Sequence, residues 1–224
     1  MEAMEETGLS TEWEHRAFGQ HTGDGYVAGL PPHCLPGIVG CFPAALHRAL
    51  LGWQHDHPGE PPLQLRVSVH RGPLPASGLG VPMVETHRLL DDRSVRTLLA
   101  RSDSRITTLA MIISQRVYED VFNSGCATGG TIAANFARQL AKVKTFSQPA
   151  WLHVPGLDWG LADPDMFDTS DTPASQASAG TMEDGSCTAK VSFHQHGAGP
   201  TWMAQNQDFR GSDFRTLLST LEND

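Results

Sequence analysis

The sequence predicts an α/β sandwich in which helices pack on one or both faces of a mixed sheet. Three observations predict this fold class. Apolar residues recur at intervals of three and four over residues 38–53, alternate with polar residues over 63–70, and form a short continuous run within 107–113. These are the patterns of an amphipathic helix, a strand with one apolar face and a buried strand. In chain order the predicted elements run ββαβαβαββ, and this alternation favours helices layered on a sheet.

A hairpin is predicted near the start of the chain. Thr11–Phe18 alternates roughly between polar and aromatic side chains, Gly19–Gly25 is rich in glycine, and Tyr26–Leu30 is apolar. Short strand-like stretches on either side of a glycine-rich turn are typical of hairpins. Asp24 is expected near the tip of this hairpin.

The next predicted element is a helix of roughly five turns. Its apolar residues lie between Ile38 and Trp53, and it is expected to end in the polar, Pro- and Gly-rich stretch His55–Pro62. Pro36 is compatible with a first helical turn. Pro43 would interrupt the hydrogen bonding of a continuous helix, so a kink is expected there.

The rest of the body is predicted to contain four strands, two helical pieces and a capped helix. Ser114 is a good N-cap residue, so a helix with Val117, Tyr118 and Val121 facing inward is predicted after it. The strands are predicted over Leu63–Val69, Thr107–Ile113, Leu140–Phe146 and Ala150–Val154, with Gln148-Pro149 separating the last two, and the helical pieces over Val84–Leu90 and Val95–Ala100.

Charge divides the chain into a nearly neutral body and an acidic end. The net charge is −9; residues 1–156 hold 14 acidic and 13 basic side chains, whereas residues 157–224 hold 11 acidic and 3 basic ones. We interpret residues 11–156 as one domain, 157–188 as an acidic disordered linker, and 189–224 as a short C-terminal motif with a small β-arch. Nucleic acids and anionic membranes are bound by clustered Lys and Arg, so neither is expected as a partner.

The cysteines and the N-terminus favour a cytoplasmic protein. Four scattered cysteines do not make a disulfide framework, and the first residues lack the basic start and apolar run of a signal peptide. No stretch approaches the ~18 apolar residues of a membrane helix. Cys34 and Cys41 are interpreted as small apolar core residues, and the spacing of His21, His70 and His87 does not suggest a metal site.

Four stretches across about residues 13–154 resemble, in the expected order, the class III nucleotide (adenylate/guanylate) cyclase homology domain, in particular the divergent type of actinobacterial regulatory and conflict proteins. His21–Val27 is similar to the family's Gly-Asp hairpin tip, Leu65–Pro73 to its "lRvgvHtG" strand, and Val84–Asp91 to its "VNlAfRLLD" helix. The closing segments are similar to Ile112–Val121, Val143-Lys144 and Trp151-Leu152. The resemblance implies a ferredoxin-like cyclase core.

The resemblance also implies roles for individual residues. In the family, two carboxylates hold two divalent ions, Mg or Mn, on a nucleoside triphosphate. Asp24 matches the second metal carboxylate, Arg88 the arginine that stabilises the transferring phosphate, and Lys144 the lysine that neutralises the tail phosphates. Gln20 and Ser77 lie where adenylate-selective members carry base-reading Lys and Asp. From the residues alone, Asp24 is equally a turn former, Arg88 a surface ion-pair partner and Lys144 a solvated side chain.

The chain departs from the family pattern in two places. It has no room before Thr11 for the strand that carries the first metal Asp, or for the helix after it, and Val84 stands where the family has Asn. The missing strand lies inside the family's sheet, so its neighbours would be left with unpaired backbone groups. Either another chain fills this position or the reading frame starts upstream of Met1. Because the family's sites form at a head-to-tail dimer interface, a homodimer or a partner protein is expected.

Two functions follow as hypotheses. The first is a catalytically degenerate cyclase-like domain that acts as a regulatory or conflict-signalling module and retains nucleoside triphosphate binding. The second is an active purine nucleotide cyclase completed by a partner chain or an N-terminal extension. The end of the chain, Val191–Pro200 with Ala204-Gln205-Asn206, is similar to short Gly- and Gln/Asn-containing β-arch motifs that pair with receptors, so a signalling partner is expected there; the alternative is a disordered end.

Overall fold

A computed structural model describes residues 2–22, 25–74, 80–126, 128–163, 190–193 and 197–206, the last two ranges by their backbone alone. The described helices are α1 Glu2–Glu6, α2 Ser10–Glu14, α3 Leu35–Gly40, α4 Phe42–Asp56, α5 Val81–Leu90, α6 Arg93–Arg101 and α7 Gln115–Tyr118, with short 3₁₀ or π turns at Pro32–Cys34 (η1), Glu119–Asn123 (η2) and Ala133–Asn135 (η3). The strands are β1 Phe18–His21, β2 Gly25–Gly29, β3 Leu65–Leu74, β4 Leu109–Ser114, β5 Ala137–Val143, β6 Phe146–His153, β7 Lys190–Phe193 and β8 Gly197–Asn206.

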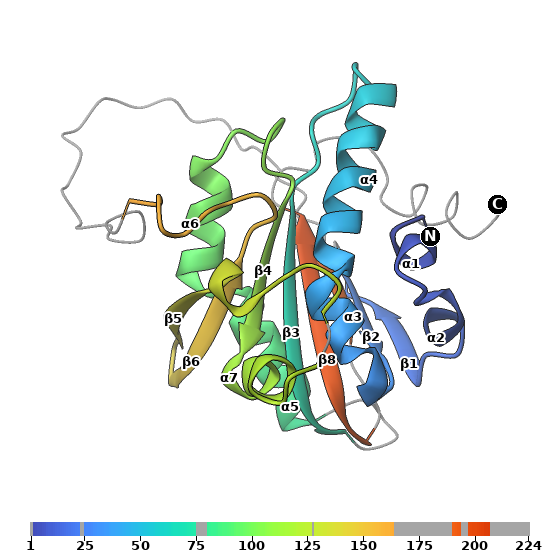
Figure 1. Cartoon of the computed structure of the whole chain (residues 1–224), viewed down its shortest axis with the longest axis vertical. Helices are drawn as coiled ribbons and strands as arrows, with labels where there is room; N and C mark the ends of the chain where they lie inside the picture. Colours follow the sequence, from blue (N-terminus) through green and yellow to red (C-terminus); the bar gives the residue numbers. More distant parts are fainter. Residues whose placement is uncertain are drawn as a thin grey trace, which may run out of the picture.

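Helices cover both faces of a mixed sheet, so the predicted α/β class is confirmed (Figure 1). One face packs against α3, α4 and α7. The other packs against α5 and α6. Strand β4 shows the division, because its alternate residues enter different cores: Leu109, Met111 and Ile113 join the α4 side, whereas Ala110 and Ile112 join the α6 side.

Among the described strands the order is β1-β2-β7-β8-β3-β4-β6-β5. β8 pairs antiparallel with β3 over all ten of its residues, and its residues 201–205 pair with β2. β7 pairs antiparallel with β8 at residues 202–205 and parallel with β2 at Gly25 and Lys190. A strand from the same chain therefore lies between β2 and β3, the kind of interior position for which the sequence suggested another chain or an upstream extension.

A buried polar ladder joins β3 to α5. Its contacts come from alternate residues of β3. The Arg66 Nη1 donates to the Leu90 carbonyl at 2.9 Å, the Ser68 hydroxyl donates to the Thr86 carbonyl at 2.9 Å, and His70 Nε2 lies 3.0 Å from Glu85 Oε2. All three β3 residues are buried. At Gly72 a Cβ would lie 2.5 Å from the Pro82 ring, so the absent side chain lets the start of α5 approach the strand.

The structure confirms the second strand of the predicted N-terminal hairpin and corrects the first. Strand β2 lies where expected, but the other arm is β1 at Phe18–His21, and residues 10–14 form α2 instead. Rough alternation over eight residues is a weak strand signal, and a one-turn helix accommodates it equally well. The tip residue Asp24 lies outside the described residues.

Two prolines have consequences that differ in part from the predictions. The predicted kink is a break: α3 ends at Gly40, and Pro43 lies in the first turn of α4, at 53° to the preceding helix. Pro149 does not separate two strands. It lies inside β6 opposite Leu140, and the ladder to β4 begins only at Ala150, so its missing N–H removes no bond there.

In the described part of the chain, no single helix is long and apolar enough to cross a membrane. The bent pair Pro32–Gly40 and Phe42–Asp56 meets that criterion only when both halves are combined. Its apolar side chains Ile38, Val39 and Phe42 are buried in the protein core.

Candidate anion-binding groove

An open groove of about 640 Å³ lies between α6 and β5. It is lined by side chains from the end of α5, from one face of α6 and from the end of β5: Asp91, Arg93, Arg96, Thr97, Ala100, Lys142 and Val143. Three of these are cations and one is a carboxylate. This volume is within the range of small-molecule sites, ~300–1,000 Å³.

The α6 side of the groove follows from helical spacing. Arg93, Arg96, Thr97 and Ala100 are three or four residues apart and therefore share one face of the helix. The opposite face carries Val95, Leu98 and Leu99 into the core. The helical spacing of these residues is visible in the sequence, but it does not show that the end of β5 would form the other side of a groove.

Asp92 fixes the position of β5 against the start of α6. Its side chain is buried and accepts a hydrogen bond from the Ser94 backbone N–H at 3.0 Å, as an N-cap does. Its second oxygen accepts from the Lys142 backbone N–H at 2.8 Å. One carboxylate thus caps α6 and holds the backbone of Lys142, the residue that carries the third cation of the groove, against the start of this helix.

The predicted phosphate-binding residues Arg88 and Lys144 do not line this groove; each is close in sequence to a residue that does, Arg88 to Asp91 and Lys144 to Val143. Arg88 is half-buried on α5, and its guanidinium lies 5.8 Å from the centre of the Phe146 ring, so a cation–π contact replaces the surface ion pair that was considered. Lys144 is exposed in the two-residue turn between β5 and β6, with a left-handed φ of 54°, and is therefore not within a strand. Both flank Phe146.

The base-reading candidates are not brought to the groove within one chain. Gln20 is exposed on β1, which is one edge of the described sheet, whereas β5 is the other edge. Gln20 can join Arg88 and Lys144 in one site only if two copies of the chain contribute to it. Ser77 lies outside the described residues, as does Asp24.

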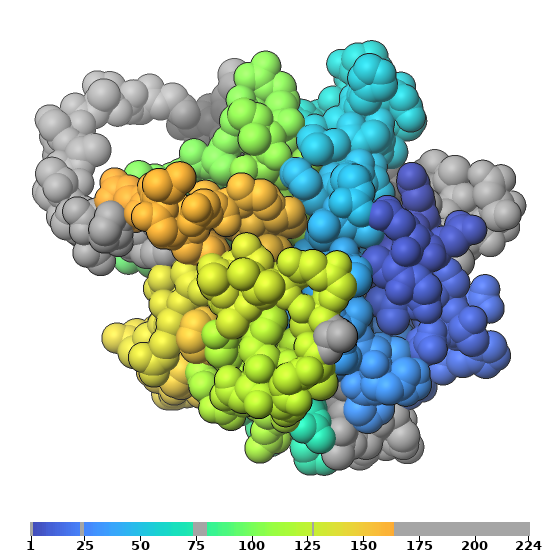
Figure 2. All heavy atoms as spheres, in the orientation of Figure 1, coloured from blue at the N-terminus to red at the C-terminus, as the bar shows by residue number. Residues whose placement is uncertain are grey.

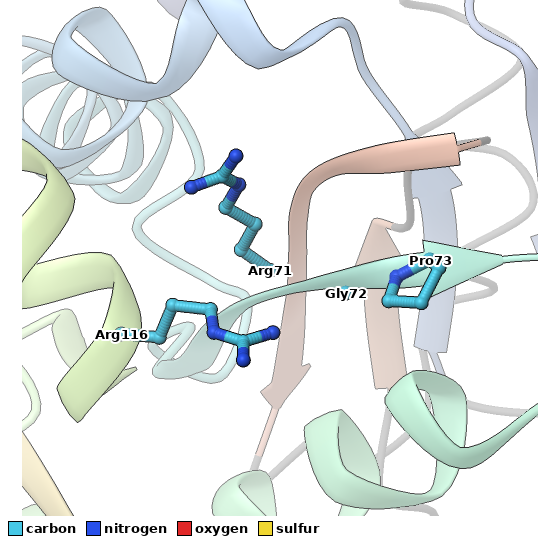
Figure 3. A pocket seen from close by; sticks show the side chains of 4 residues that line it. All are labelled: Arg71, Gly72, Pro73 and Arg116. Carbon is cyan, nitrogen blue, oxygen red and sulfur yellow. The ribbon is translucent and has the colours of Figure 1, made fainter.

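A second cation-lined pocket, of about 300 Å³, lies between the C-terminal end of β3 and α7. Figure 3 shows Arg71 extending from β3 and Arg116 reaching toward β3 from α7, beside Gly72 and Pro73. Arg71 Nη1 donates to Asp120 at 2.6 Å, so part of its charge is already balanced. The hydrogen bond from His70, with smaller contributions that include Arg116, lowers the pKa of Glu85 and keeps it ionised.

The expected Mg or Mn site cannot be assembled from the residues at the groove. Asp91 is the only carboxylate that lines it. Among the described residues, one group of three side chains has metal-ligand atoms within 4.8 Å of one another, and it is Glu12, His33 and Cys34 on α2 and η1. The metal expectation therefore rests on Asp24 alone.

Comparisons of this chain with protein-family models, with curated proteins and with solved structures found no match. The geometry of the groove and the motif resemblance are therefore the basis for a functional proposal.

Proposed function

We propose that this protein is a catalytically degenerate, cyclase-like regulatory module that binds a nucleoside triphosphate through its phosphates in the groove between α6 and β5. The observation that carries the proposal is that Arg93, Arg96 and Lys142 line one groove, with Asp92 joining the start of α6 to β5 through the backbone N–H groups of Ser94 and Lys142. Cationic side chains at the start of a helix form a favourable environment for phosphate groups.

The resemblance supports the same location. Of the two cations that match the family's phosphate-binding residues, Arg88 lies against Phe146 and is one helical turn before Asp91, and Lys144 directly follows Val143; Asp91 and Val143 both line the groove. A ferredoxin-like cyclase core accounts for a mixed sheet with α5 and β3 in contact. Val84, in place of the family's Asn, is an exposed apolar side chain one turn from Arg88 and offers no hydrogen bond to a ribose. Binding without turnover is the expected result.

The test is titration of the purified chain with fluorescent ATP and GTP analogues in the presence of Mg²⁺. Replacing both groove arginines, Arg93→Gln with Arg96→Gln, is expected to weaken binding about a hundredfold or more, since each hydrogen bond to a charged group is worth ~1.5–3 kcal/mol. The matched control Arg48→Gln removes an exposed charge from α4, on the other face of the sheet, and is expected to leave affinity unchanged. Equal binding by the double variant and the wild type would refute the site.

An active purine nucleotide cyclase is the second candidate, because Asp24, Arg88 and Lys144 all match family positions. Incubation with ATP or GTP and Mn²⁺ distinguishes the two functions. The degenerate module yields no cyclic nucleotide. Product that disappears in Asp24→Ala would establish the cyclase instead.

We also propose that the module acts in signalling through association. Gln20 and the Arg88–Lys144 region lie at opposite edges of the sheet, so a shared site requires a homodimer or a partner protein. A cytoplasmic location and a signalling contact of the C-terminal segment 189–224 belong to the same proposal, but β8 is paired with β3 and β2 inside the sheet, so the contact is assigned to the residues of this segment outside β8. Light scattering at several protein concentrations, with and without ATP, tests the dimer: a monomer under all these conditions would contradict it.

A further inference from the structure

Helix α2 is held to the body by few contacts of its own. It has five residues, too few for a helix to be stable in isolation, and none of them is buried. Trp13 packs against Tyr26 with ring centres 5.4 Å apart. By contrast, α1 places Ala3 and Met4 in the core against α4. In Figure 2 these N-terminal residues, in blue, lie along the side of the α3–α4 region.

Glu12 of α2 faces His33 and Cys34 of η1. Glu12 Oε1 lies 3.4 Å from His33 Nε2, and the ligand atoms of all three residues lie within 4.8 Å of one another. The other carboxylate oxygen, Oε2, is buried without a hydrogen-bond partner. A buried, unsatisfied carboxylate oxygen is costly, and a cation at this position would satisfy it.

The η1 turn presents its two ligands in a fixed arrangement. Pro31 and Pro32 restrict the backbone before it, and the Cys34 N–H donates to the Pro31 carbonyl at 3.0 Å. Cys34 is 2% exposed, whereas the His33 side chain is 68% exposed. A cation bound here would therefore be enclosed on the cysteine side and open to water on the histidine side.

We propose that Glu12, His33 and Cys34 bind a divalent metal ion, with Zn²⁺ as the preferred ion, and that this ion fastens α2 to the start of α3. A thiolate, an imidazole and a carboxylate are the three ligand types that zinc takes in proteins, with water at the fourth, open position. Two anionic ligands and a neutral imidazole balance the charge of the ion.

Binding requires the loss of one proton from Cys34. Burial, with a smaller contribution from Glu12, raises the pKa of this thiol to about 11, so the metal-free protein carries the neutral thiol at physiological pH. A coordinating divalent ion deprotonates the thiol, and the proton is released to solvent. Affinity is therefore expected to rise about tenfold for each unit of pH while the thiol remains protonated in the free protein.

Cobalt is the probe, because a thiolate bound to Co²⁺ gives an intense near-ultraviolet charge-transfer band. The reduced full-length protein, titrated with Co²⁺ alone, is expected to show this band at one equivalent and to lose it when Zn²⁺ is added. Cys34→Ser is expected to abolish the band. Cys41→Ser and Cys126→Ser are matched controls that remove the other described cysteines and are expected to retain it.

A second variant, at the exposed ligand His33, separates loss of metal binding from loss of folding. His33→Gln changes a largely exposed side chain, so the fold is retained, and the affinity for Co²⁺ is expected to fall at least tenfold. Amide exchange in residues 10–16 is expected to slow when Zn²⁺ is added to the wild type and to remain unchanged in His33→Gln. Absence of the band, or a band that survives Cys34→Ser, would overturn the proposal. Equal affinity in His33→Gln would overturn it as well.

Discussion

The two faces of strand β3 are built from opposite kinds of side chain. Toward α4 the strand presents Leu65, Val67 and Val69, which enter an apolar core. Toward α5 it presents Arg66, Ser68 and His70, which are equally buried but are joined to the helix by polar contacts. Apolar burial is not directional, whereas hydrogen bonds require particular positions. At β3, therefore, the α4 face contributes apolar burial, whereas the contacts on the other face fix the position of α5, whose end leads into the candidate groove.

The largest expected effect lies on the apolar face. Ile113→Ala removes a fully buried side chain from β4 and should lower the free energy of unfolding by ~2–5 kcal/mol, because the cavity adds to the lost burial. Denaturant-induced unfolding measures this change. Ile106→Ala, at a residue that is 70% exposed, is the matched control and should have little effect. Equal losses for both variants would contradict the assignment of the core.

The next effect falls on the α6 side. Asp92→Ala removes both the N-cap of α6 and the acceptor of the Lys142 N–H, so a loss of ~1–2 kcal/mol in the free energy of unfolding is expected. Nucleotide affinity should fall as well, since Lys142 is no longer tied to the helix. Ser94→Ala keeps the backbone donor to Asp92 and provides the comparison. A variant with lowered stability but unchanged affinity would separate Asp92 from the groove.

A smaller effect is expected from the polar ladder. Ser68→Ala removes the hydroxyl that donates to the Thr86 carbonyl and leaves that acceptor buried, with a cost of ~1 kcal/mol in unfolding free energy. The change should be smaller than that of Ile113→Ala. If the two were equal, the contrast between the faces would be wrong.

The smallest effect concerns pH. The hydrogen bond from His70 is the main cause of the lowered pKa of Glu85, whose ordinary value is 4.5. A carboxyl group whose pKa is lowered on folding stabilises the folded state above the unfolded pKa, and this contribution is lost as the pH falls through the folded value. Glu85→Gln should therefore flatten the fall in unfolding free energy below about pH 4.5. Glu14→Gln, at an exposed residue of α2, should leave the fall in unfolding free energy below about pH 4.5 unchanged. If the unfolding free energy of Glu85→Gln fell with pH as steeply as that of the wild type, the stabilising hydrogen bond between His70 and Glu85 would be contradicted.

Much of the fold was predictable because its patterns are local. The alternation over 63–70 predicted β3, and Ser114 predicted the start of α7, where its hydroxyl accepts from the Val117 N–H. The alternation did not show that the polar residues of β3 would be buried, because that depends on the carbonyls of α5, which lie elsewhere in the chain. The pairing of β8 with β3 joins segments more than a hundred residues apart and likewise has no local signal.

The candidate site likewise contains some residues that local patterns indicate and others that only the fold brings together. Arg88 is indicated by a motif, and the structure places its guanidinium against Phe146, whereas its role in phosphate binding stays a prediction. Arg93 and Arg96 were overlooked, although their spacing on a predicted helix was visible, because only the fold brings Lys142 opposite to them. At Cys34 the interpretation as a buried apolar residue is correct for its burial, but Glu12 and His33, its neighbours in the structure, were not considered as its partners.

The most direct test of phosphate binding on the α5–α6 face is a map of backbone amide shifts on titration with inorganic tripolyphosphate. The proposed site predicts that the largest shifts fall on Arg93, Arg96 and Lys142 and their neighbours and that they vanish in the variant carrying both Arg93→Gln and Arg96→Gln. Shifts centred instead on Arg71 and Arg116, in the pocket of Figure 3, would place the anion between β3 and α7 rather than between α6 and β5 and would contradict the proposed site.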